Sequence, residues 1–270
     1  AMAEATYLDP FDGRMFYFQF EKEYTHDAAA LWFRENFVVP WVAIVVYVVA
    51  VHGGRYLMQS SSEFRLKRSL TLWNIFLTLL SWCMFVRIVP VLVHRLVYHG
   101  LHFSVCDMEF GDGPSGFWVL VFSLSKIPEM VDTVFLVLRK RPVIFLHWYH
   151  HITVMIYSWH CYAYATPTGL WFQSMNVTVH SFMYFYYFLS SIGARPRWNI
   201  LLTAGQILQM VVGSAVAFYA FYLEQIGEGC SNPANVRYGA LLYLSYLALF
   251  AHFFYRAYLA PKPKRAKRDC

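Results

Sequence analysis

Residues 145–157 read FLHWYHHITVMIY, an apolar run that carries three histidines at positions 147, 150 and 151. An α-helix turns about 100° per residue, so side chains three or four positions apart share one face. The three imidazoles therefore point the same way from a predicted helix. One alternative is a polar patch that neighbouring helices satisfy. Ionisable groups inside a membrane span are costly and commonly mark function, which favours a functional site.

The composition of the whole chain is typical of a membrane protein. Its 270 residues are 58% hydrophobic, 20% aromatic and only 14% charged, with a mean hydropathy of +0.39. Soluble domains carry about 25% charged residues. We therefore expect an all-α integral membrane protein with one helical bundle. The net charge of +6 lies in short clusters between apolar runs, where it indicates membrane topology rather than nucleic-acid binding.

Seven apolar runs of about 20 residues predict seven transmembrane helices. Most Lys and Arg residues fall on alternate connections, which places the C-terminus in the cytosol and the N-terminus in a lumen. We expect a lumenal segment at 1–36 with a short interfacial helix, a transmembrane domain at 37–259 and a basic cytosolic tail at 260–270. The expected spans are 37–57, 70–93, 116–138, 143–164, 170–192, 198–223 and 238–259.

The same topology leaves Cys106 and Cys230 in lumenal connections. The first follows a polar stretch, expected to be a loop, and the second lies in the loop at 224–235. An oxidising lumen would allow the two thiols to form a disulfide. Two free thiols are the alternative.

Further polar residues are expected at the depth of the three histidines. A helix rises about 1.5 Å per residue, and on this scale four other spans bring polar side chains to the cytosolic half of the bilayer. We predict a reaction chamber open to the cytosol. Neutralisation of one side chain by another on the same helix, or simple bonding between helices, would be structural alternatives. The layer comprises Lys126, Glu129, Asp132, Asn176, His180, Gln206, Gln209 and His252.

A neutral imidazole can act as a base, a nucleophile or a metal ligand. Nucleophilic use of His150 needs a second group to handle protons and a third to orient the ring. His147, His151 and His180 could supply both, without any serine or cysteine.

Metal use would require additional histidine clusters. A second cluster exists at His94, His99 and His102, but it is expected on the lumenal side and cannot join the first. This separation counts against a histidine-box di-iron desaturase or hydroxylase, which stays as an alternative. A seven-span transporter or receptor is another alternative, although it would need a ligand path open to the lumen.

Four motifs in order resemble the ELO fatty-acid elongases, the condensing enzymes of very-long-chain fatty-acid synthesis. The resemblance covers most of the chain. One such motif would be a weak signal, whereas four on successive spans are specific. They are Lys126-x-x-Glu129-x-x-Asp132-Thr133, His147-x-x-His150-His151, Asn176-x-x-x-His180-x-x-Met183-Tyr184-x-Tyr186-Tyr187 and Thr203-x-x-Gln206-x-x-Gln209.

The resemblance implies a seven-helix enzyme of the endoplasmic reticulum. It would condense an acyl-CoA with malonyl-CoA to 3-oxoacyl-CoA, CO2 and CoA, with no cofactor and no metal. It implies that His150 accepts the acyl group as an acyl-imidazole and that His180 assists malonyl-CoA. The other two histidines would orient or tune them, and Tyr187 would join the supporting layer. Implied partners are membrane lipid, the reductase and dehydratase of the elongation cycle, and a second copy of the chain.

The two substrates also suggest where each part of them binds. CoA phosphates need cations at the cytosolic mouth, although the same basic residues could serve topology or lipid phosphates. The acyl chain would run past the histidines into the aromatic lumenal half. Polyunsaturated-type elongases tend to have Gln where Pro142 stands, so the resemblance is to the saturated and monounsaturated subgroup. The candidate phosphate ligands are Arg139, Lys140, Arg141, Arg195, Arg197, Lys262, Lys264 and Arg265.

Overall fold

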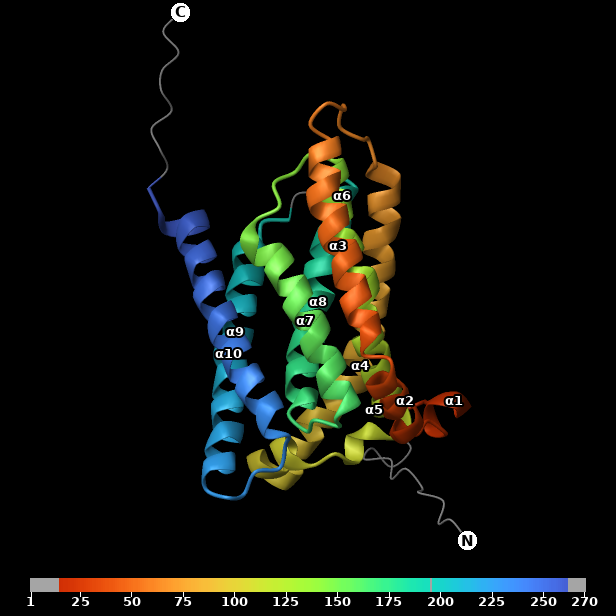
Figure 1. Cartoon of the computed structure of the whole chain (residues 1–270), viewed down its shortest axis with the longest axis vertical. Helices are drawn as coiled ribbons and strands as arrows, with labels where there is room; N and C mark the ends of the chain where they lie inside the picture. Colours follow the sequence, from red (N-terminus) through yellow and green to blue (C-terminus); the bar gives the residue numbers. More distant parts are fainter. Residues whose placement is uncertain (1–14, 195, 262–270) are drawn as a thin grey trace, which may run out of the picture.

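The structure is a computed structural model that describes residues 15–194 and 196–261, and within these ranges it contains helices and no strand. Its long helices run side by side along one axis (Figure 1). A helix occupies each of the seven expected ranges, which confirms the all-α prediction. The helices are α1 (Gln19–Lys22), α2 (His26–Glu35), α3 (Val38–Leu57), α4 (Lys67–Cys106), α5 (Gly113–Glu129), α6 (Val131–Leu138), α7 (Phe145–Ala163), α8 (Gly169–Ser191), α9 (Asn199–Gln225) and α10 (Pro233–Phe254), with a 3-10 turn at Glu109–Gly111 and a π-helical turn at Tyr255–Leu259.

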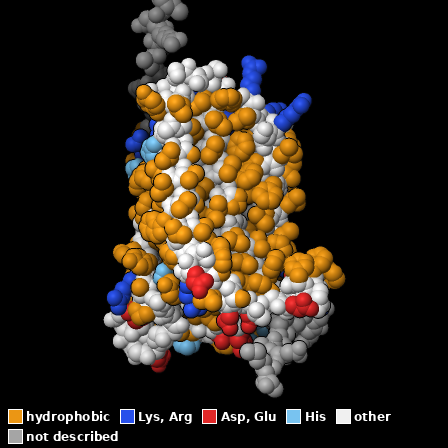
Figure 2. Space-filling view, turned by 45° about the vertical axis from the view of Figure 1, so that its right-hand side comes forward, with side chains coloured by type: hydrophobic (Ala, Val, Ile, Leu, Met, Phe, Trp, Pro, Cys, Tyr) orange, Lys and Arg blue, Asp and Glu red, His pale blue; other side chains and the backbone are white. Residues whose placement is uncertain are grey.

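Four helices in the described ranges are long enough and apolar enough to cross a membrane: α3, α4, α9, and α10 extended to Leu259. Figure 2 shows the matching surface, a broad hydrophobic belt with charged side chains gathered toward the two ends. Helices suit this environment because they satisfy their backbone polar groups internally. Helices α7 and α8 are less apolar because they carry histidines and other polar side chains, and α5 is shortened by a break at Glu129.

The bundle is held by two extensive helix pairs, α4 with α8 and α9 with α10. Helix α2, expected from the sequence as a short helix near residue 27, packs across the end of α7. There the indole of Trp159 is fully buried and donates to the Phe33 carbonyl at 2.8 Å, while Arg34 donates to the Ala163 carbonyl at 2.7 Å. These contacts close one end of the bundle.

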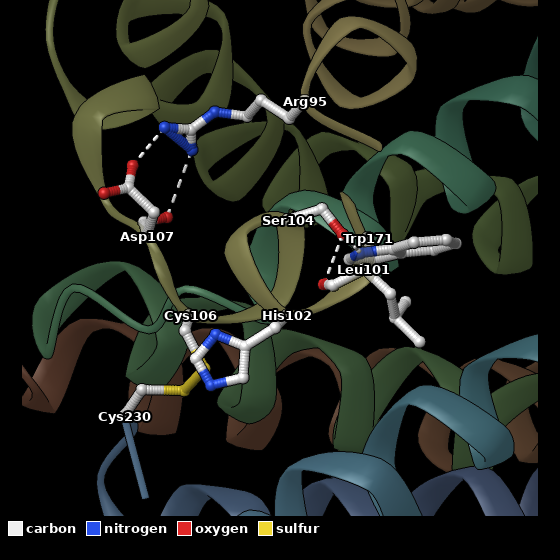
Figure 3. Close-up of a disulfide and its surroundings, with 8 residues drawn as sticks. All are labelled: Arg95, Leu101, His102, Ser104, Cys106, Asp107, Trp171 and Cys230. Atoms are coloured by element: carbon white, nitrogen blue, oxygen red, sulfur yellow. Dashed lines mark hydrogen bonds and ion pairs between the residues drawn. A yellow bond between two sulfur atoms is a disulfide. The ribbon is translucent and has the colours of Figure 1, made fainter. Parts of the chain in front are cut away.

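Helix α4 is much longer than the expected span 70–93. The sequence predicted a polar loop after residue 93, and this prediction was wrong, because the chain continues as helix to Cys106 with a kink at Gly100. Gly100 has φ +84°, a conformation that favours glycine. Buried Arg95 forms an ion pair with Asp107 just beyond the helix end (Figure 3). Tertiary pairing therefore keeps a polar segment helical.

The expected third span is divided into α5 and α6. Pro128 lies in the last turn of α5, where a proline lacks the N–H needed for a helical hydrogen bond. Helix α6 restarts at Val131, and Thr133 N–H bonds to the Met130 carbonyl at 3.2 Å. The break falls between Glu129 and Asp132, so these two residues of one sequence motif lie on separate helices.

A disulfide joins Cys106 to Cys230, the expected pair, and thereby ties the end of α4 to the loop before α10 (Figure 3). The same loop caps α10, because the Asn232 side chain accepts from the N–H of Ala234 at 3.0 Å and of Asn235 at 3.3 Å. The start of α10 is therefore fixed both covalently and by hydrogen bonds.

Cys106→Ser is expected to lower thermal stability in detergent. A disulfide that closes so long a loop, with a sequence separation of 124, contributes about 4–5 kcal/mol in the chain-entropy account. Thermal unfolding with and without reductant measures the effect. Cys83→Ser is the matched control, since Cys83 is free and exposed. Equal melting temperatures for the two variants would contradict the assignment.

Close approach of α9 and α10 depends on Gly213. A Cβ at this position would lie 2.1 Å from the Tyr243 ring, so any larger residue must displace that ring or separate the helices. Small residues commonly allow such contacts between membrane helices. By contrast, a Cβ at Gly205 on the same helix would meet nothing within 4 Å.

Gly213→Ala is therefore expected to lower the melting temperature because it displaces Tyr243. Gly205→Ala should leave it unchanged or raise it, since alanine favours a helix over glycine by about 1 kcal/mol. Both are measured by thermal unfolding in one detergent. A Gly213→Ala protein as stable as Gly205→Ala would show that the contact is not needed.

Candidate functional site

A cavity of about 880 Å³ lies within the bundle, and all four predicted histidines, His147, His150, His151 and His180, line it. Six helices contribute to its wall: α4, α6, α7, α8, α9 and α10. The structure therefore brings together residues that the sequence placed at one depth on separate helices. Other predicted residues on the wall are Asp132, Asn176, Tyr187, Gln206 and Gln209.

Helix α7 presents its three histidines on one side, as the helical spacing predicted. The ring centroids of His147 and His151 are 4.7 Å apart, and those of His150 and His151 are 5.6 Å apart. Thr153 one turn later bonds to the Tyr246 hydroxyl at 2.6 Å, which fixes α7 against α10. The histidines thus lie on a helix whose rotation is set by its neighbours.

Behind the cavity wall lies a buried ion pair between Lys126 and Glu129. Lys126 Nζ lies 2.7 Å and 3.0 Å from the two carboxylate oxygens, and Ser125 adds a hydroxyl donor at 2.9 Å. The expected neutralisation within one helix therefore occurs, but the pair also reaches a second helix. Lys126 Nζ donates to Asn176 Oδ1 at 3.0 Å.

This contact determines how His180 is held. Because an ammonium can only donate, Asn176 turns its oxygen to Lys126 and its amide nitrogen to His180 Nε2, 3.2 Å away. His180 Nε2 must then accept, so its ring proton is on Nδ1. That atom faces Glu129 Oε2 at 3.8 Å. The ion pair and Asn176 together fix the tautomer and orientation of His180.

Asp132 is hydrogen-bonded to residues outside this ion pair. Its carboxylate accepts from Trp73 Nε1 at 2.6 Å and from the Tyr184 hydroxyl at 2.8 Å. The expected alternative, a pair with a nearby histidine, is not what these contacts show. Asp132 instead joins α4, α6 and α8 at the edge of the cavity.

His147 is held by a hydroxyl relay. Thr133 Oγ1 lies 2.9 Å from His147 Nε2 and 2.9 Å from the Tyr47 hydroxyl, and both Thr133 and Tyr47 are buried. If the phenol donates to Thr133, the threonine proton goes to Nε2 and the ring proton of His147 stays on Nδ1. Thr133 stands in a recognised motif, whereas Tyr47 gave no signal, because one tyrosine in an apolar span resembles any core aromatic.

His252 was expected in the polar layer, and the structure corrects this. Its side chain is exposed on α10, whereas Phe250 and Phe253 of that helix line the cavity. Two residues correspond to a rotation of about 200°. His252 therefore lies on the expected helix but on the side that faces away from the cavity.

Cations lie at one end of the cavity. Arg139 lines it, and so does Lys67 at the start of α4, which the sequence had not singled out. Three other candidates are exposed and do not line the wall: Lys140, Arg141 and Arg197. The remaining candidates, Arg195, Lys262, Lys264 and Arg265, lie outside the described residues.

The second histidine cluster is far from the first. Lys67 lines the histidine cavity, and His94 lies about 40 Å further along the same helix. His102 lies beside the disulfide, 3.9 Å from Cys106 Sγ (Figure 3). Among residues 15–194 and 196–261, no group of three or more His, Cys, Asp or Glu side chains is placed to hold a metal ion.

Known proteins resemble nearly the whole chain. Residues 32–266 match the family described as "ELO: GNS1/SUR4 family". "Very long chain fatty acid elongase 6" of Gallus gallus is 41% identical over 255 residues, covering 93% of this chain and 96% of that protein. The Homo sapiens protein of the same name is 40% identical with the same coverage. "Fatty acid elongase 3" of Trypanosoma cruzi is 42% identical over 268 residues, covering 88% of this chain and 89% of the relative.

Thr133→Val is expected to destabilise the protein by about 1–3 kcal/mol, because it leaves the Tyr47 hydroxyl and His147 Nε2 without a partner in a buried place. Thr133→Ser keeps the hydroxyl and should restore most of the loss. Thermal unfolding in detergent compares the two. If the valine variant were as stable as the serine variant, the Thr133 hydroxyl would not hold Tyr47 and His147 as described.

Proposed function

The chain belongs to the ELO family and is a fatty-acid elongase, and from this premise we propose that it condenses an acyl-CoA with malonyl-CoA in the histidine cavity. The products are 3-oxoacyl-CoA, CO2 and CoA. One observation supports this use of the cavity above all. Four histidines line a single space of about 880 Å³ that also carries Lys67 and Arg139 at one end. The cations at one end suit the polyanionic CoA, and the enclosed space beside the histidines suits the apolar acyl chain.

His150 is the proposed nucleophile. His147 is engaged by Thr133 and His180 by Asn176, whereas the ring nitrogens of His150 and His151 form no hydrogen bond with the described residues. Of these two, His151 is buried and His150 is the more open to the cavity. The His150 ring only packs against its neighbours, with the Tyr246 ring centroid 5.3 Å away. An unengaged imidazole nitrogen keeps its lone pair available for attack.

The proposed reaction has two stages. A ring nitrogen of His150 attacks the thioester carbonyl, the C–S bond breaks, and CoA leaves as the thiol after taking up the imidazole proton. Malonyl-CoA then loses CO2, and the resulting enolate carbon attacks the acyl-imidazole carbonyl. The C–N bond breaks, and His150 returns to the neutral imidazole by taking up one proton from water in the cavity. Decarboxylation drives this condensation, and the two stages balance without any transfer of electrons to or from a redox cofactor.

Lys67 and Arg139 are the proposed phosphate ligands, since both line the cavity at the end where CoA would enter. Pro142 favours a saturated or monounsaturated acyl group through the family resemblance. We further propose that all seven helical ranges cross the endoplasmic reticulum membrane, with the C-terminus in the cytosol. The disulfide at the opposite end from Lys67 and Arg139 supports this orientation, because disulfides persist in an oxidising compartment.

Purified protein incubated with labelled malonyl-CoA and a panel of acyl-CoAs should form labelled 3-oxoacyl-CoA. Without malonyl-CoA, it should release about one equivalent of CoA and gain the mass of the acyl group. His150→Ala should abolish both, with a loss of at least about 10³-fold, because it removes the covalent acceptor. Mass spectrometry and CoA release measure these steps.

His252→Ala is the matched control, since it removes a histidine from the outer surface of α10 and should leave turnover unchanged. Full condensation by the His150→Ala protein would exclude the acyl-imidazole. Absence of product from every acyl-CoA, with malonyl-CoA present, would overturn the proposed reaction itself.

A further inference from the structure

The large cavity adjoins a second, narrow cavity of about 40 Å³. His150, Asn176, Gln209 and Met210 line both, so the two spaces meet beside the proposed nucleophile. The narrow cavity extends along α7 to Cys161, away from the cationic end of the large cavity. An acyl group held on His150 would therefore direct its distal end into it.

The reach of this path can be estimated from helix geometry. His150 and Cys161 are separated by about 16 Å along α7. Carbon–carbon bonds of about 1.5 Å, arranged in a zigzag, cover that distance with roughly a dozen bonds. The end of a medium-to-long acyl chain thus comes to the far end of the narrow cavity.

That far end is not purely apolar. Gln173 lines it and is only 4% exposed, yet its Oε1 has no hydrogen-bond partner among the described residues. Leaving a buried amide oxygen unpaired is costly. Asn235 is satisfied, because it accepts from the Tyr157 hydroxyl at 3.3 Å and donates to Cys161 Sγ at 3.3 Å. The Thr166 and Ser174 hydroxyls are also buried without a partner among the described residues, but neither residue lines the narrow cavity. Gln173 therefore presents an open acceptor.

Space is available beside the carboxamide of Gln173, on the side of its nitrogen, because residue 169 is a glycine. A Cβ at Gly169 would lie 3.6 Å from Gln173 Nε2 and 3.9 Å from Cys161 Cβ. Gly169 also lines the narrow cavity. The missing side chain thus leaves room next to the Gln173 carboxamide, where an incoming group can approach.

We propose that this end of the cavity binds a terminal hydroxyl, so that the enzyme accepts ω-hydroxyacyl-CoA substrates. The O–H of the chain end donates to Gln173 Oε1, and the methylene groups pack against Phe122, Val154 and Leu242. The inference rests on the proposed function, because it needs the acyl carbonyl near His150. Ordered water could supply the same O–H donor, and the experiment separates the two sources.

The test compares matched chains that end in methyl or hydroxyl, such as tetradecanoyl-CoA and 14-hydroxytetradecanoyl-CoA, with shorter and longer pairs alongside. The measured quantity is the ratio of kcat/KM for the hydroxyl-ended chain to that for the methyl-ended chain. Gln173→Met keeps the length and unbranched shape of the side chain but removes the acceptor. It should lower the ratio about tenfold, since a buried hydroxyl then lacks its partner.

Gln173→Leu is a second variant, used if Gln173→Met fails to fold. The melting temperature of each variant shows whether it is folded. Gln225→Leu makes the same chemical change at an exposed position on α9 and should leave the ratio as in the wild type. A ratio that stays within twofold in the Gln173 variants overturns the proposal and leaves only water as the donor. Failure of the wild type to elongate hydroxyl-ended chains, while methyl-ended chains react, also overturns it. Failure with both chain types would instead contradict the proposed function.

Discussion

The buried ion pair of Lys126 and Glu129 is the interaction on which the organisation of the site depends. Two charges in a low-dielectric interior are stable only when they are paired and their remaining hydrogen-bonding groups are satisfied. Ser125 and Asn176 complete that satisfaction, and Asn176 transmits the orientation to His180. The pair therefore connects α5 to α8 and sets which nitrogen of a cavity histidine carries the proton.

The histidines of the cavity differ because their surroundings differ. A hydroxyl relay holds His147, an amide holds His180, and no hydrogen bond restrains the ring of His150. His151 likewise forms no hydrogen bond with the described residues, so the four imidazoles differ in their surroundings rather than in their own chemistry. Asp132, by contrast, forms no hydrogen bond with a cavity histidine among the described residues. Its two donors, Trp73 and Tyr184, leave it as a junction between three helices and not as a histidine partner.

Much of the architecture could be predicted from local patterns. Apolar runs of membrane-spanning length located every long helix, and motif spacing identified the histidines, Asp132, Asn176 and the two glutamines that line the cavity. The extension of α4 could not be predicted in this way, because its polar segment is stabilised by the Arg95–Asp107 ion pair, whose partners lie on either side of the kink at Gly100. Tyr47 and Trp73 were missed for a related reason. An aromatic residue in an apolar span gives no sign that its polar edge has a buried partner.

The sequence by itself determined the class of the protein, the order of its helices and the position of each polar residue along its helix. These follow from hydropathy and from a constant rise per residue, which are local properties. Only the tertiary structure decided which way each helix is turned about its axis. His180 faces the cavity and His252 faces outward, although both were expected in the polar layer. Rotation is set by packing against neighbours, such as Tyr243 on Gly213, and no single helix contains that information.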